Sequence, residues 1–154
     1  MITEEIYHVI SRFLNLIEQG TDHELGNAQM LEKTLDELAL AVHFVGDEFD
    51  SSNFDAPKQN PAELWMLVEQ RFPQLGFYNM PGNLYDSIAD SDIVVGSAID
   101  DIVDIAIDLT EVLWRWKNTS EQDALWHFKF GYRSHWGAHL RSLQSYLYER
   151  IKDI

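Results

Sequence analysis

Two histidines near the end of the chain have the spacing of a helical ligand pair. His135 and His139 stand at positions i and i+4, which places two imidazoles side by side on a helix and suits a divalent metal. Carboxylates from a facing segment could complete the ligand set, and oxygen-rich ligands would accept Mg or Mn as readily as Zn. The zinc-protease motif is excluded, because Trp136 stands where that motif has its general-base Glu.

The carboxylates that face this pair are expected from the segment 97–117. At about 100° per residue its charged side chains share one narrow arc, and nearly all other positions are apolar. The acidic members of the arc are Asp100, Asp101, Asp104, Asp108 and Glu111. Such a pattern predicts a helix that is buried over most of its circumference, with one polar stripe.

The stripe and the histidines should meet in a helical hairpin. Only about three residues separate the segment 97–117 from a second long helical pattern over 120–152, so we expect two antiparallel helices. His135 and His139 border or enter the apolar face of the second helix. The nearest acidic residues by height along the hairpin are Asp100, Asp101 and Asp104.

Two interpretations of this histidine and aspartate group follow from the sequence. In the first, His135 and His139 donate hydrogen bonds to the aspartates and complete a buried polar seam, because an isolated buried charge is costly. In the second, both histidines and Asp104 bind a divalent metal between the two C-terminal helices, as in a metal-dependent hydrolase. We expect the first, and therefore predict no cofactor.

Three aromatic residues form a second candidate surface, a partner patch of Trp114, Trp126 and Phe130. Trp126 and Phe130 lie opposite the core face of the helix 120–152, and exposed aromatic rings at this spacing suit a protein partner or a homodimer. Alternatively, the first two helices cover this side and make it a second core face. Both alternatives are compatible with the sequence.

The rest of the chain also has helical periodicity, with apolar residues at steps of three and four. Helices are expected over about 4–19, 24–45 and 61–72. Residues 46–60 have no period and are rich in turn formers, which predicts a loop, and 84–95 are expected to be irregular or briefly helical. The prediction is an all-α, single-domain bundle of four to five helices over 1–154, with a long C-terminal antiparallel helical hairpin.

Composition narrows the function. The chain has 154 residues, of which 45% are hydrophobic, which is typical of one folded domain. There are 26 acidic and 11 basic residues, and the net charge of −15 disfavours nucleic acid and anionic membranes as partners. The absence of Cys excludes disulfides and thiolate chemistry. There is no long apolar stretch or signal-peptide pattern, so a cytoplasmic location is expected.

Part of the sequence resembles a bacterial family of uncharacterised proteins. The shared stretches are Arg71–Tyr78, Asp100–Ile105, Asp108–Leu109, Ala124–Trp126 and His135–Leu140. They are similar to the DUF5063 family over about residues 70–150, and the His-Trp-Gly-Ala-His stretch is the most specific part. The resemblance implies a helical fold and no particular activity.

No catalytic motif is assembled in the sequence. A nucleotide-binding glycine loop, a GxSxG nucleophile elbow and a P-loop are all missing. The expected function is therefore that of a cytoplasmic, acidic, α-helical binding or interaction protein without catalytic activity. The alternative is a metal-dependent hydrolase that uses the His/Asp group.

Overall fold

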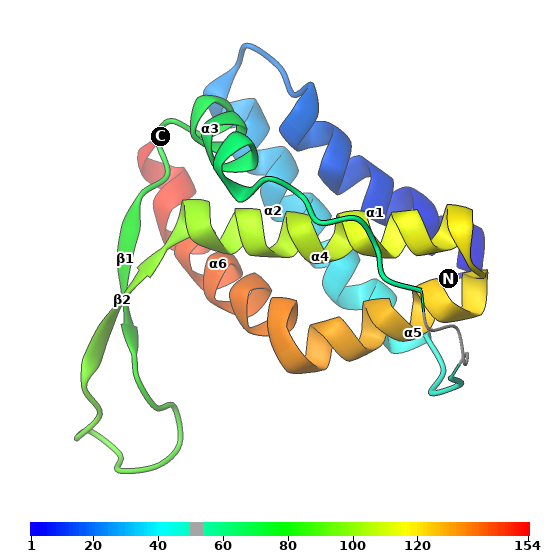
Figure 1. Cartoon of the computed structure of the whole chain (residues 1–154). Helices are drawn as coiled ribbons and strands as arrows, with labels where there is room; N and C mark the ends of the chain where they lie inside the picture. Colours follow the sequence, from blue (N-terminus) through cyan, green and yellow to red (C-terminus); the bar gives the residue numbers. More distant parts are fainter. Residues whose placement is uncertain (50–53) are drawn as a thin grey trace.

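The computed structural model describes residues 1–49 and 54–154, and most of this part of the chain is α-helical, as predicted (Figure 1). The α-helices are α1 (Thr3–Glu18), α2 (Glu24–Ala41), α3 (Pro61–Arg71), α4 (Ala98–Asn118), α5 (Glu121–Gly131) and α6 (Gly137–Arg150). Short single turns follow α2 (η1, Val42–Phe44), connect α5 to α6 (η2, Tyr132–Trp136) and end the chain (η3, Ile151–Asp153).

Local capping sets where the helices that carry the site begin. The Ser97 side chain accepts a hydrogen bond from the Asp100 amide and starts α4, and the Ser120 side chain accepts one from the Asp123 amide and starts α5. Only Thr119 and Ser120 stand between the end of α4 and the start of α5. The chain therefore reverses direction there, and α5 and α6 pack back along α4, as the sequence predicted.

The predicted central helix is α4. It packs against α1, α3, α5 and α6, and Figure 1 shows it crossing the other helices. Most of its apolar side chains are buried, including Ile102, Ile105 and Leu109, and Ile107, Leu113, Trp114 and Trp116 are partly buried. Because most of its circumference is covered, only the polar stripe is left to carry chemistry.

The expectation of a purely helical chain was wrong in one segment. Residues Phe77–Pro81 (β1) and Ile93–Ser97 (β2) form an antiparallel two-stranded sheet that projects from the helical body (Figure 1). The end of the 84–95 segment, expected to be irregular or briefly helical, is strand. The β-branched run Ile93-Val-Val favours a strand, but an 11-residue connection hides the pairing because it lacks a short turn signature.

The second long C-terminal helix is interrupted. Between α5 and α6, η2 is a π-helical turn, which inserts extra backbone into the helix. Trp136 is fully buried there, and its indole Nε1 donates to the Phe128 carbonyl oxygen at 3.2 Å. Gly131 leaves room for that indole, because a Cβ on this residue would lie 2.9 Å from the Trp136 ring.

The predicted 46–60 loop has no regular structure at 46–49 and 54–60, and residues 50–53 lie outside the described part. Lys129 ties its beginning to α5, since Nζ donates to the Val45 carbonyl oxygen at 2.8 Å and lies 2.7 Å from the Asp47 carboxylate. Among the described residues, no helix has the length and apolar character needed to cross a membrane.

Candidate functional site

His139 on α6 lies between two carboxylates of α4. Its ring Nδ1 is 2.8 Å from the Asp101 Oδ1, and its Nε2 is 3.2 Å from the Asp104 Oδ2. The Asp101 side chain is only 8% exposed, whereas His139 and Asp104 are partly exposed. The ring therefore bridges a buried and an accessible carboxylate, with one nitrogen facing each.

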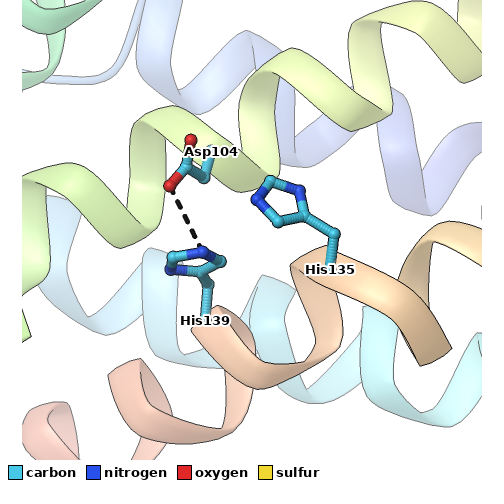
Figure 2. A group of neighbouring side chains, drawn as sticks. All are labelled: Asp104, His135 and His139. Atoms are coloured by element: carbon cyan, nitrogen blue, oxygen red, sulfur yellow. Dashed lines mark ion pairs between the residues drawn. The ribbon is translucent and has the colours of Figure 1, made fainter.

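His135 stands one turn earlier and has a different partner. Its Nδ1 is 2.7 Å from the Asp108 Oδ2, and about half of its side chain is exposed. The centroids of the two imidazole rings are 5.0 Å apart. Figure 2 shows both rings reaching from their helix toward Asp104 on α4, so that the three side chains border one small space.

The buried carboxylate of Asp101 has a third partner from outside the helical hairpin. The hydroxyl of Tyr78, on β1, donates a short hydrogen bond to the Asp101 Oδ2, and the Tyr78 ring stacks on Tyr146 with centroids 5.0 Å apart. Burial, together with the hydrogen bond to Asp101, raises the pKa of the Tyr78 hydroxyl, which keeps it a donor. Sequence analysis missed Tyr78 as a site residue, although this residue ends the stretch Arg71–Tyr78 that resembles the DUF5063 family.

The aspartates around His139 favour the positively charged form of its imidazole. The hydrogen bond to Asp101 raises the pKa of the His139 imidazole, and the nearby Asp104 carboxylate adds to that effect. Burial raises the pKa of the Asp104 carboxyl and also that of the Asp108 carboxyl, against the opposing effect of the histidines. With a carboxylate beside each ring nitrogen, His139 is stabilised as a doubly protonated imidazolium.

The same geometry matches a set of metal ligands. Asp104, His135 and His139 each offer one ligand atom, and these atoms lie within 4.8 Å of one another. Within the described ranges 1–49 and 54–154, no other group of three or more histidine and acidic side chains has its ligand atoms this close together. Asp101 and Asp108 stand behind them as hydrogen-bond partners of the two imidazoles.

A cavity adjoins the group on the side of His135. Its volume is about 220 Å³, and it lies between α4, α5 and η2. Among the side chains that line it are Asp108, His127, Phe130 and His135. A molecule bound in this cavity would contact the same His135 ring that faces Asp104.

The structure partly changes the predicted pairing. Asp101 and Asp104 do contact a histidine, but both contact His139. The expectation that Asp100, Asp101 and Asp104 are the nearest acidic residues was wrong for His135, because its partner is Asp108, about one turn further along α4 than Asp104. Asp100 is exposed in the first turn of the helix, where its amide donates to the Ser97 cap.

The partner patch comes together only in part. The rings of Trp126 and Phe130 stack with centroids 4.8 Å apart, and Phe49 packs edge-on against Trp126 at the same distance. Phe130 is exposed, while Trp114 is partly buried on α4. Among the described residues, no ring contact joins Trp114 to this stack. A dimer or a partner held by Trp126 and Phe130 stays a prediction.

Comparison with known proteins places this geometry in a wider context. The profile of a domain of unknown function, DUF5063, matches residues 1–150, which extends the resemblance seen over 70–150 to nearly the whole chain. No curated protein matches the chain significantly. The crystal structure of protein BF1032 from Bacteroides fragilis is similar, with a TM-score of 0.72 and 12% identity, over 95% of this chain and 92% of that one. At this identity the likeness concerns the fold alone.

Proposed function

The chain belongs to the DUF5063 family, a domain of unknown function, and we propose that it is a metal-binding protein that holds a divalent transition-metal ion through Asp104, His135 and His139. It would do so in the cytoplasm, a reducing compartment with which its cysteine-free composition agrees. This differs from the interaction protein expected first from the sequence, and it adopts the metal site of the alternative hypothesis.

The orientation of the two imidazoles carries the proposal. Each Nδ1 is held by a carboxylate, His139 by Asp101 and His135 by Asp108, at 2.8 and 2.7 Å. A carboxylate accepts, so each Nδ1 must carry hydrogen, which leaves Nε2 as the ligand atom. Carboxylate support behind a ligating histidine is the usual outer shell of metal sites, where it fixes the tautomer and the ring orientation.

The distances require only small movements. Two ligands of a tetrahedral ion with bonds of about 2.0 Å lie about 3.3 Å apart, and the His139 Nε2 and the Asp104 Oδ2 are already 3.2 Å apart. An ion bound between these two atoms would displace the proton from that nitrogen. His135 would complete the set by rotation of its half-exposed side chain, since the three ligand atoms lie within 4.8 Å of one another.

The ligand types favour particular ions and leave room for chemistry. Two imidazoles and one carboxylate suit Zn²⁺ or Fe²⁺, whereas Mg²⁺ prefers an all-oxygen shell. Three protein ligands leave an open position, as in catalytic rather than structural zinc sites, and an ion there lowers the pKa of a bound water. The cavity beside His135 supports the second candidate function, a metal-dependent hydrolase.

Titration of Zn²⁺ into the tag-free, chelator-treated chain by calorimetry tests the proposal. We expect one ion per chain, and a loss of affinity of at least about 100-fold in His139→Ala. Asp101→Asn and Asp108→Asn keep all three ligands, so each should weaken Zn²⁺ binding by about 10 to 100-fold, as outer-shell changes do.

His8→Ala is the matched control. His8 lies beside Glu4 on the exposed surface of α1, so its imidazole could bind Zn²⁺ weakly without belonging to the site. It should leave the tight binding unchanged. If His8→Ala and His139→Ala reduce Zn²⁺ affinity equally, or if neither reduces it, the proposed site is wrong.

A further inference from the structure

The β-hairpin has apolar side chains on the face that is directed away from the helices. Its register pairs Tyr78 with Gly96 and Met80 with Val94, which puts Tyr78, Met80 and Val94 on the face that includes the contact with the helices. The alternate residues point the other way. They form the outer hairpin face, defined here as Phe77, Asn79, Pro81, Ile93, Val95 and Ser97.

The outer hairpin face is exposed and mostly apolar, with Asn79 and Ser97 as its polar members. Phe77, Ile93 and Val95 are 77%, 69% and 73% exposed, and Figure 1 shows the hairpin extending away from the helical body. A two-stranded antiparallel sheet normally turns its polar side to water. An exposed, mostly apolar strand face of this kind is typical of an interaction site, because water contact with the apolar side chains is unfavourable.

Charge determines which partner fits. The hairpin from residue 77 to residue 97 carries Asp86, Asp90 and Asp92 and has no Lys, Arg or His. A second copy of the chain would bring another net charge of −15 to this surface, and an anionic membrane would be repelled in the same way. A partner with basic residues around an apolar centre is attracted instead.

We propose that the outer hairpin face docks a partner protein whose binding surface has an apolar centre bordered by Lys and Arg side chains. Phe77, Ile93 and Val95 would fill the apolar centre, and the three aspartates of the connecting loop would pair with the basic border. This interaction surface is independent of the proposed metal site, since none of its residues is a ligand or an outer-shell partner there.

Two peptide libraries with the same apolar core test the proposal, one flanked by Lys and Arg and the other by Glu. Displayed on phage, they are selected against the full chain, and enriched peptides are then titrated in solution. We expect enrichment from the basic library only. Phe77→Ser combined with Val95→Thr should weaken the selected peptides by at least about 10-fold, and Asp86→Asn with Asp90→Asn and Asp92→Asn by a similar factor.

Met66→Ser is the matched control, because Met66 is a comparably exposed apolar residue on α3, away from the hairpin. It should not change peptide affinity, and all variants should keep the wild-type melting temperature because the changed side chains are exposed. The proposal is overturned if the acidic library is enriched equally, if no peptide is sensitive to the Phe77 and Val95 changes, or if sedimentation shows that this face holds a second copy of the chain.

Discussion

At the scale of single residues, Asp101 is the organising group of the site. Its buried carboxylate holds the imidazole of His139 and the hydroxyl of Tyr78 at the same time. Each of its two oxygens accepts one of these hydrogen bonds, and the positive charge favoured on His139 lies beside it. The Asp101 carboxylate thereby links α4, α6 and the hairpin.

Replacement of that carboxylate should lower the pKa of His139. The hydrogen bond with Asp101 raises this pKa above the ordinary value of about 6.5, so NMR titration of the metal-free wild type should place it above that value. In Asp101→Asn the negative charge is lost while the side-chain size is retained, and the His139 pKa should fall back toward 6.5 or below. An unchanged pKa would show that Asp101 does not hold the ring in solution.

The raised pKa of His139 also makes the stability of the metal-free protein depend on pH. Because folding raises the pKa of His139, the protonated imidazole stabilises the metal-free protein. This stabilisation is fully present below the unfolded-state pKa near 6.5 and is lost as the pH rises through the folded-state pKa. The raised pKa of the Asp104 and Asp108 carboxyls acts in the same direction at lower pH. The melting temperature of the metal-free wild type should therefore fall between pH 6 and 8 by more than that of His139→Asn.

The polar stripe and the histidine pair were predictable from sequence because helical periodicity fixes which side chains share a face. On this basis the sequence predicts Asp101 and Asp104 near His139. Tyr78 could not be found in this way. It reaches Asp101 from a strand distant from both helices, and no local periodicity reports such a contact.

At the scale of elements, the π-helical turn η2 explains why the height of His135 was misjudged. The prediction that Asp104 is the last acidic residue near this height holds only for one straight helix over 120–152. Figure 1 shows that α5 and α6 form a bent rod, which advances less along α4 for each residue than a straight antiparallel helix would. His135, at the bend, consequently lies beside Asp108.

The turn depends on a glycine at its end, and Gly137→Ala tests this dependence. A Cβ on Gly137 would overlap the backbone carbonyl oxygen of Tyr132 and crowd its ring. The helix propensity of alanine is more favourable than that of glycine by up to about 1 kcal/mol. Overpacking of the added methyl group against the backbone, however, costs about 1 to 3 kcal/mol. We therefore expect a net loss of stability in chemical denaturation.

Gly76→Ala is the control for this substitution, because a Cβ on Gly76 would meet no atom within 4 Å. It should change the free energy of unfolding by less than about 0.5 kcal/mol, as surface substitutions usually do. If Gly137→Ala were as stable as wild type, the close packing of Gly137 against the Tyr132 backbone would not exist in solution.

At the scale of the whole molecule, the acidic side chains outnumber the basic side chains that could form ion pairs with them. The chain has 15 more acidic than basic residues, and Arg115, the one buried basic side chain among the described residues, makes internal contacts. The Arg115 guanidinium lies 3.0 Å from the Asp123 carboxylate and 2.9 Å from that of Glu111. Burial disfavours its charge, but these hydrogen bonds outweigh burial and raise the pKa of Arg115.

Self-repulsion should make the protein more stable as monovalent salt is added. The screening length falls from about 30 Å at 0.01 M salt to about 10 Å at 0.1 M, which weakens repulsion among exposed carboxylates. The Arg115 and Asp123 pair is almost fully buried and is screened much less. Each kcal/mol gained raises the melting temperature of a chain of this size by about 2 to 4 °C, so calorimetry from 0.01 to 0.3 M NaCl in the presence of chelator should show a rise of a few degrees. A steady fall over this range would mean that exposed attractive ion pairs, such as that between Arg12 and Glu37, contribute more than the net repulsion does.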